Sequence, residues 1–204
     1  MYKFKPILKS MLWGGDKIIP YKEVESDKKQ VGESWEISGV KENESVVAEG
    51  VDAGMKLPEL IARDKAALLG KSNYERFGKE FPLLIKFIDA RQDLSIQVHP
   101  NDETAARQGK MRGKTEMWYV IDSEKNSKIT YGVKEDITKK ELSDAIENNT
   151  ASELLNTVPS KMPEYEVEGE SKYEGDYYFV NDSHKIAKNK TLYLSERFVS
   201  GYTH

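Results

Sequence analysis

The sequence predicts a single, mainly β domain over residues 1–204, organised as a barrel that carries helices at one end. Two observations lead to this prediction. Most of the chain consists of short apolar runs bounded by Gly, Pro, Asn or Asp, which is typical of strands and turns. Helical spacing of apolar residues recurs in two segments, at about residues 56–77 and 138–156, and residues 103–107 are expected to add a single helical turn.

The composition is that of a globular protein. Charged residues make up 32% of the chain and apolar ones 38%, which is enough for a buried core. The net charge of −4 argues against a nucleic-acid platform, although a local basic patch is sufficient to hold a phosphate group. No segment has the pattern of a membrane span or a cleaved leader, so we expect a cytoplasmic protein with no membrane partner. Because cysteine is absent, any metal must be bound by nitrogen or oxygen ligands.

Strands and turns dominate the first half of the chain. Gly14–Asp16 is a predicted turn in which small residues take positive φ. Gly32–Ser38 and Val46–Ala48 have strand character. Leu83–Ala90 is a nearly continuous apolar run that only Lys86 interrupts, which predicts a central strand.

The two helical segments have recognisable starts and stops. In the first, we expect two short helices joined near Asp64 and Gly70. In the second, Thr138 and Glu141 have the spacing of a capping box, which marks the start of a helix. Asn148–Thr150 is expected to divide this second segment in two.

The predicted strand Leu94–His99 carries two possible metal ligands. Its alternation of apolar and polar residues directs Gln97 and His99 to the same face. Glu116 opens a second apolar run, to Ile121, which predicts a strand paired with or near the first. An amide oxygen, an imidazole and a carboxylate on one face suit zinc or another divalent metal. From the residues alone, the commoner alternative is a histidine that ends a strand and a glutamine on a solvated face.

Five segments share their order and spacing with one known family. They are Ser10–Gly15 (SMLWGG), Gly32–Ser38 (GESWEIS), Pro82–Ala90 (PLLIKFIDA), Ser95–Asp102 (SIQVHPND) and Gly113–Tyr119 (GKTEMWY). In these segments the chain resembles the class I mannose-6-phosphate isomerases, in their shorter bacterial form. The resemblance extends from residue 1 to about residue 180.

The resemblance implies a cupin-type jelly-roll barrel with a helical insertion and one zinc ion per chain. Gln97, His99 and Glu116 match three zinc ligands of the family. Ser95 and Lys114 match positions near the substrate, where a hydroxyl and an ammonium group suit a phosphate or a sugar oxygen. The implied activity is a metal-dependent aldose–ketose isomerisation between mannose 6-phosphate and fructose 6-phosphate, through an enediol. No residue of this sequence is assigned as the general base.

The fourth ligand is predicted at His184, where the sequence departs from the family's pattern. Glu174–Val180 matches a family strand, but Asn181–Ser183 replace a Pro-Ala-Gly turn and the histidine comes two residues early. The family also continues through a glutamine-rich strand, an arginine-bearing segment and a second small β-domain, whereas this chain stops at His204. Two alternatives follow. One is a catalytically incomplete zinc-binding cupin domain with a sugar-binding or regulatory role, and the other is a weak three-ligand site that His184 does not complete.

Overall fold

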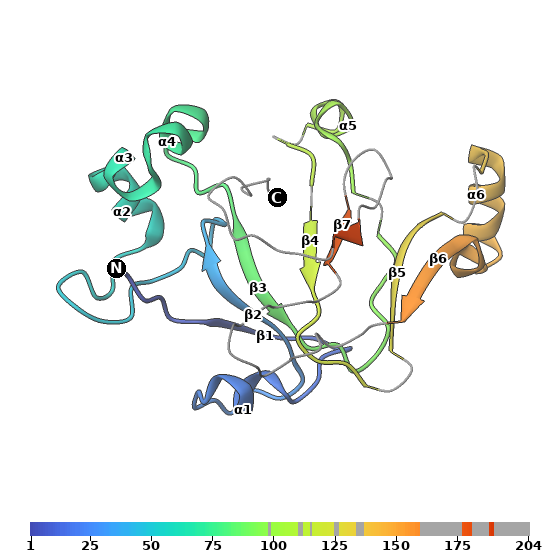
Figure 1. The fold of residues 1–204 in the computed structure, drawn as a ribbon, viewed down its shortest axis with the longest axis horizontal. Helices are drawn as coiled ribbons and strands as arrows, with labels where there is room; N and C mark the ends of the chain where they lie inside the picture. The colour runs from blue at the N-terminus through green and yellow to red at the C-terminus, as the bar shows by residue number, and fades with distance from the viewer. Residues whose placement is uncertain are drawn as a thin grey trace. The chain divides into compact units, whose positions relative to one another are not determined.

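The fold is given by a computed structural model (Figure 1). It describes residues 1–97, 99–109, 112–114, 116–124, 127–133, 137–159, 177–180 and 188–189. These residues form two compact units: the first holds residues 1–97, and the second holds the described residues from 99 onward. None of the helices within these ranges is long and apolar enough to cross a membrane.

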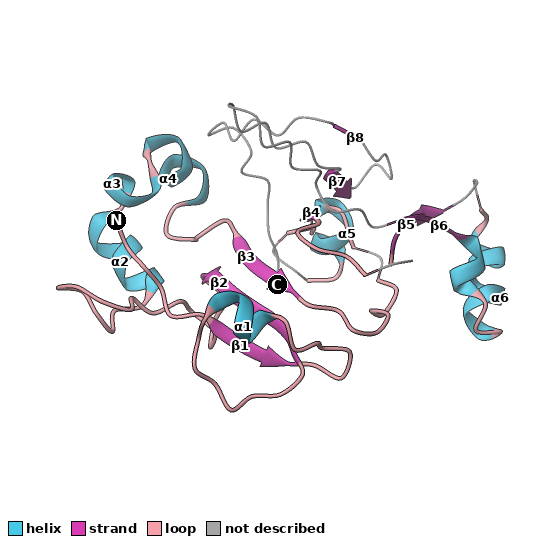
Figure 2. Cartoon of the chain, turned by 60° about the horizontal axis from the view of Figure 1, so that its bottom comes forward, coloured by secondary structure: helices cyan, strands magenta, loops and turns pink. Residues whose placement is uncertain are grey.

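An antiparallel sheet is the centre of the first unit (Figures 1 and 2). Its order is β1 (Ile7–Ser10), β2 (Val31–Ser38) and β3 (Leu84–Ile88). The strand predicted at residues 32–38 is therefore confirmed. β3, however, was expected at the centre and lies at the edge of the described sheet. Ile85 of β3 is 45% exposed, so the continuous apolar run does not mark a strand buried on both faces.

Helix α1 (Ile18–Lys22) packs against this sheet (Figure 2). The ring of Tyr21 meets that of Phe87 edge-on, with centroids 5.6 Å apart. The Lys22 ammonium lies 2.6 Å from a carboxylate oxygen of Glu36. An aromatic contact and a partly buried ion pair therefore hold α1 on the face of the sheet that carries Phe87 and Glu36.

Three short helices follow, where two were expected: α2 (Leu57–Asp64), α3 (Ala66–Leu69) and α4 (Lys71–Phe77). The chain breaks at Gly70, as predicted, and also at Lys65, which has a φ of 51°. The break at Lys65 lies next to Asp64, where a junction was also expected, although lysine is an unusual residue at positive φ. Of these helices, only α2 contributes to the buried apolar core of the first unit, whose members are Ile18, Val31, Val47, Leu57, Leu60 and Ile61.

Arg63 of α2 joins three parts of the first unit. Its guanidinium nitrogens lie 2.6 and 2.9 Å from the two carboxylate oxygens of Asp52. The same guanidinium donates to Asp64 at 2.7 Å. The Tyr2 hydroxyl donates to Asp52 at 3.0 Å. The N-terminal segment, the loop at Asp52 and helix α2 are therefore linked through one arginine.

We expect Arg63→Gln to lower the urea midpoint of unfolding at neutral pH. The hydrogen bond of Arg63, followed by that of Tyr2, lowers the pKa of Asp52 from 3.8 to about 2. Because this pKa is lower in the folded state, the stabilisation is complete above pH 3.8 and is lost as the pH falls toward 2. The variant should lose less stability across that window, as measured by urea unfolding at a series of pH values. Arg76→Gln is the control, and equal pH profiles for the two variants would contradict the assignment.

The second unit contains two small antiparallel sheets and two helices. Its elements are α5 (Asp102–Arg107), β4 (Glu116–Tyr119), β5 (Lys128–Val133), α6 (Lys139–Glu147), the 3₁₀ helix η1 (Ala151–Leu154), β6 (Leu155–Pro159), β7 (Tyr177–Val180) and β8 (Lys188–Asn189). The sheet orders are β4-β7-β8 and β5-β6. Thr138 and Glu141 make the predicted capping box. The backbone nitrogen of Thr138 lies 2.7 Å from a carboxylate oxygen of Glu141, and the backbone nitrogen of Glu141 lies 3.2 Å from the hydroxyl oxygen of Thr138. The split between α6 and η1 at residues 148–150 is also confirmed.

Two predictions about strands are wrong. Residues 94–97 and 99 are not in a strand, and Ile96, predicted to be buried, is 51% exposed. β4 was expected to pair with or lie near the segment at residues 94–99; it pairs with β7, but Glu116 of β4 lies 2.9 Å from His99, so the expected nearness is confirmed. At residues 46–48, Val46 and Val47 form only isolated bridges. A strand requires a partner, and alternation within one segment cannot specify which partner is available.

The fold class is confirmed in part. Antiparallel sheets with helical insertions are present as predicted. Helices occupy about as much of the described chain as strands do, so these residues are mixed α and β rather than mainly β. The described strands form three separate sheets, and none of these is a closed barrel.

Gly14 and Gly15 are required for close packing, and not for positive φ as predicted. Neither residue has a φ in the left-handed region. A Cβ atom on Gly14 would lie 2.2 Å from the backbone oxygen of Gln30, and one on Gly15 would lie 2.3 Å from the Asp89 carboxylate. The segment after β1 therefore lies directly against the start of β2 and the end of β3.

Candidate metal and substrate site

Three of the predicted site residues meet in the second unit. The carboxylate of Glu116, at the start of β4, has a different partner on each oxygen. One oxygen lies 2.9 Å from Nε2 of His99. The other lies 2.7 Å from the ammonium group of Lys114. The side chains of His99, Glu116 and Lys114 are 17%, 20% and 32% exposed, so the cluster is partly buried.

Hydrogen bonds around α5 explain why His99, Lys114 and Glu116 meet. The Lys114 N–H donates to the carbonyl oxygen of Pro100 at 2.9 Å. The Gly113 N–H donates to the Asp102 carboxylate at 2.8 Å. Asn101 caps α5 by accepting from the N–H of Thr104 at 2.8 Å. Residues 112–114 therefore return to the segment that follows His99, and β4 begins beside it.

We expect Gly113→Ala to weaken this arrangement. Its Cβ would lie 2.5 Å from the carbonyl carbon of Asn101 and 2.6 Å from the oxygen of Pro100. These are backbone atoms that cannot rotate away, so the two segments must separate, at a cost of about 1–3 kcal/mol. The free energy of unfolding should fall by this amount, and any metal bound at His99 and Glu116 should be held less tightly. Urea unfolding and metal titration measure the two effects.

Gly109→Ala is the matched control in the same loop. Gly109 has a φ of 72°, but its Cβ would meet nothing within 4 Å. This change should cost about 1 kcal/mol through backbone strain alone. It should leave metal affinity unchanged. If both variants lost the same metal affinity, close packing at Gly113 would not be what positions the site.

The surroundings of Glu116 favour its charged form. Partial burial raises the pKa of Glu116, but the hydrogen bond and charge of Lys114, followed by those of His99, outweigh burial and hold this pKa below its usual value. An ionised carboxylate beside an imidazole nitrogen is a suitable pair of ligands for a divalent metal. Groups of three or more metal-binding side chains are absent from the described part of the chain.

Ser95 and Gln97 lie in the first unit and are exposed. The Gln97 side-chain nitrogen donates to the Ser95 hydroxyl at 3.1 Å. The amide oxygen, which is the atom that would bind a metal, is not used in this hydrogen bond. Gln97 is separated from His99 by one residue, so chain connectivity keeps their Cα atoms within about 7 Å. The fourth predicted ligand, His184, lies outside the described residues.

The sequence interpretation missed the residues that build the frame of this site. Asn101, Asp102 and Gly113 hold the two site segments together, yet none was singled out as functional. One signal was available in the sequence. Asn101 is a good N-cap residue, and acidic residues follow it in the first turn of α5. The role of Gly113 depends on a tertiary contact and has no such local signal.

Comparison with known proteins gives a consistent result. Residues 1–114 match the family model for the catalytic domain of type I phosphomannose isomerase. The chain is 37% identical over 188 residues to mannose-6-phosphate isomerase ManA of Bacillus subtilis, covering 91% of this chain and 54% of that protein. It is 33% identical over 185 residues to mannose-6-phosphate isomerase of Streptococcus mutans, covering 91% and 53%.

A solved structure agrees with these matches. The crystal structure of the mannose 6-phosphate isomerase from Bacillus subtilis has a TM-score of 0.71 and 31% identity, covering 88% of this chain and 52% of that one. The chain thus spans about half the length of the relatives that it matches. Because the matched family model covers more than half of the chain, the chain belongs to the type I phosphomannose isomerase family.

Proposed function

We propose that this chain is a metal-dependent aldose–ketose isomerase that interconverts mannose 6-phosphate and fructose 6-phosphate. The observation that carries the proposal is the Glu116 carboxylate, held between the imidazole of His99 and the ammonium of Lys114. Family membership and the names of the relatives support the same reaction. The proposal includes a closed cupin-type jelly-roll barrel, formed as one domain in the full chain, and a cytoplasmic location.

In this proposal, Gln97, His99, Glu116 and His184 hold one zinc ion. The donor chemistry fits, because the described pair supplies an imidazole nitrogen and an ionised carboxylate, and the chain has no thiol to compete. When bound, zinc supplies a positive centre that stabilises negative charge on the sugar oxygens. Lys114 keeps one carboxylate oxygen of Glu116 fixed, so the other oxygen stays directed toward His99.

Lys114 and Ser95 are proposed to bind the sugar phosphate. An ammonium group has three N–H donors, and the Glu116 contact uses one of them. Because Lys114 is partly exposed, the remaining donors are available to a phosphate or sugar oxygen. Ser95 is exposed and its hydroxyl oxygen accepts a hydrogen bond from the Gln97 amide, so its own O–H is suited to orienting a substrate beside a metal ligand. These contacts would fix the opened sugar for proton transfer between its first two carbons.

The test is to measure zinc content and isomerase turnover on the same preparation of the chain. We expect about one zinc per chain and turnover of mannose 6-phosphate that chelation removes and added zinc restores. Bound zinc without turnover would refute the isomerase and favour the second candidate below. A chain that binds no divalent metal under any condition would refute both.

The second candidate is a catalytically incomplete zinc-binding domain with a sugar-binding or regulatory role. It is supported by Asn181–Ser183, which replace the Pro-Ala-Gly turn that the resemblance leads us to expect. Such a domain would bind mannose 6-phosphate without converting it. Calorimetry with mannose 6-phosphate, together with analysis of the recovered sugar, separates binding from turnover.

A further inference from the structure

Trp118 lies on the strand face that carries the proposed site. β4 pairs with β7 in an uninterrupted register from Glu116 to Tyr119, so side chains alternate regularly between its two faces (Figure 1). Lys114 and Glu116, two residues apart, point the same way, since the Lys114 ammonium lies 2.7 Å from a Glu116 carboxylate oxygen. The same alternation places Trp118, two residues after Glu116, on this face.

Burial along β4 agrees with this alternation. Met117, the residue between Glu116 and Trp118, is 46% exposed and therefore lies on the open face of the strand. Glu116 and Trp118 are both half-buried, which is expected of neighbours on the opposite, more covered face. Trp118 is therefore outside the closed core, and part of its side chain remains accessible to solvent.

A molecule bound at Glu116 would meet Trp118 next. Cα atoms two residues apart on a strand are about 6.6 Å from each other, so consecutive side chains on one face are immediate neighbours. Lys114 and Glu116 show that such a pair makes direct contact at this site. A sugar phosphate held at Glu116 therefore has an ammonium group on one side along the chain and an indole ring on the other.

The indole supplies what the rest of the cluster lacks. His99, Glu116 and Lys114 present an imidazole, a carboxylate and an ammonium group, all of which are polar. Small-molecule sites combine a few polar groups of this kind with apolar or aromatic walls. Trp118 offers both a broad apolar ring and one N–H donor.

The N–H group of Trp118 is unpaired within the ranges that the structure describes. Trp35 differs, because its indole N–H donates to a Glu33 carboxylate oxygen at 2.7 Å. A covered indole usually has a hydrogen-bond partner. A half-buried indole that has no acceptor among these residues is therefore suited to donate to a hydroxyl group of a bound molecule.

We propose that Trp118 is a substrate-contact residue that recognises the sugar rather than the phosphate. Its ring packs against C–H groups of the sugar's carbon chain, and its N–H donates to a sugar hydroxyl. This role rests on the proposed isomerase site, and it extends that site beyond the metal ligands, Ser95 and Lys114. A ligand that has the phosphate but no carbon chain, such as inorganic phosphate, would leave Trp118 untouched.

The experiment follows the tryptophan fluorescence of the zinc-loaded full chain during titration with mannose 6-phosphate. Wild type should show a saturable change in emission, and Trp118→Phe should lose most of this change although Trp13 and Trp35 remain. In equilibrium dialysis, Trp118→Leu should weaken binding about 3–10-fold, since the aromatic contact is lost, with zinc content unchanged. Trp118→Phe keeps an aromatic ring and should recover part of this affinity. Met117→Leu, on the opposite face, is the matched control and should bind mannose 6-phosphate as wild type does.

Each outcome decides a separate question. Equal emission changes in wild type and Trp118→Phe, or equal affinities in wild type and Trp118→Leu, would overturn the contact while leaving the isomerase intact. An emission change of the same size with inorganic phosphate would overturn recognition of the sugar. Mannose 6-phosphate bound with the Trp118 signal but without turnover would refute the isomerase and retain the contact. Should Trp118→Leu fail to fold, the emission of Trp118→Phe and the titration of wild type with inorganic phosphate still give the decision.

Discussion

His99→Ala should remove zinc from the chain and abolish isomerase turnover. The variant deletes the imidazole that lies 2.9 Å from Glu116 and that the proposal assigns to the metal. Loss of a residue that only supports a metal ligand weakens metal affinity by about 10–100-fold, so loss of a ligand itself should cost at least about 100-fold. Zinc content after dialysis and turnover of mannose 6-phosphate measure the two effects.

Two further variants make this test specific. His204→Ala removes a histidine outside the predicted ligand set and should leave zinc content unchanged. Glu116→Gln keeps the size of the side chain but removes its charge, and should reduce zinc content as His99→Ala does. If His99→Ala retained stoichiometric zinc and full turnover, the proposed metal site would be wrong. If His204→Ala lost zinc as well, the loss could not be assigned to His99.

Lys114→Ala should raise the KM for mannose 6-phosphate by about 10–100-fold. This range corresponds to the roughly 1.5–3 kcal/mol of one hydrogen bond between a cation and a charged acceptor. Lys114 also holds one oxygen of Glu116 at 2.7 Å, so a purely structural role would lower kcat and zinc content instead. Steady-state kinetics on zinc-loaded variants separates the two roles.

Two control variants test whether the effect of Lys114→Ala comes from the charge at this position. Lys114→Arg retains the positive charge beside Glu116 and should recover part of the lost affinity. Lys128→Ala changes an exposed lysine on β5 and should leave KM unchanged. An unchanged KM in Lys114→Ala, with zinc still bound, would contradict a role for Lys114 in substrate binding.

Local features of the fold could be predicted from the sequence. The capping box at Thr138 and Glu141 was correct because both partners lie within one helical turn. The split at residues 148–150 was correct because Asn-Asn-Thr is a local run of residues that disfavour helix. The strand at residues 94–99 was wrong, because alternation shows what a strand would bury but not whether a partner strand is present. Lys65 adopts a positive φ that nothing in its side chain favours.

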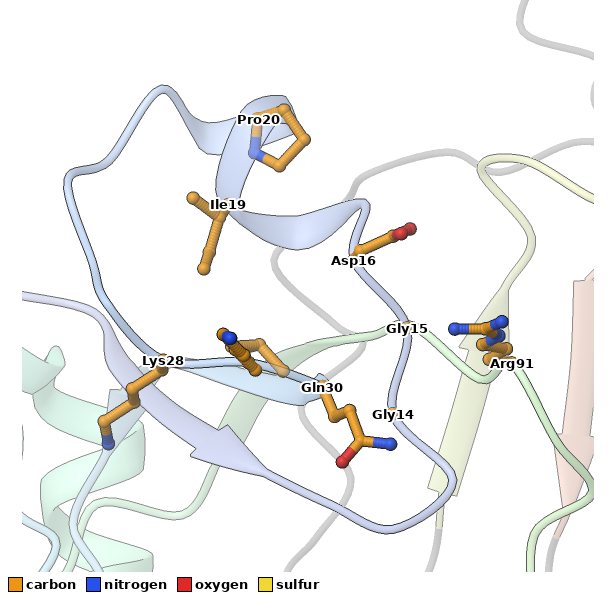
Figure 3. A pocket seen from close by; sticks show the side chains of 10 residues that line it. Gly14, Gly15, Asp16, Ile19, Pro20, Lys28, Gln30 and Arg91 are labelled. Carbon is orange, nitrogen blue, oxygen red and sulfur yellow. The ribbon is translucent and has the colours of Figure 1, made fainter.

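In the candidate site, too, local features could be predicted from the sequence and tertiary contacts could not. The residue types of His99 and Glu116 indicated a metal, and the spacing of Lys114 and Glu116 indicated a common strand face. The contact between His99 and Glu116 depends on the packing of Gly113 against Pro100 and Asn101, which is tertiary. A pocket lined by Gly14–Asp16, residues 28–31 and Arg91 (Figure 3) was not predicted at all. Its walls come from segments far apart in the sequence, and each segment alone has the composition of an ordinary loop.

The return of residues 112–114 to Pro100 also determines the order in which the proposed site can assemble. His99 and Glu116 are 17 positions apart, so they meet by closing one short loop, whereas His184 lies much farther along the chain. Each doubling of loop length adds only about 0.6 kcal/mol of closure entropy, but contacts between distant segments form more slowly. His99 and Glu116 can therefore meet, with Gln97 two positions from His99, while most later strands are still unpaired. A zinc ion that arrives during folding would find three of its four proposed ligands close together in the sequence, and it would help to draw in His184.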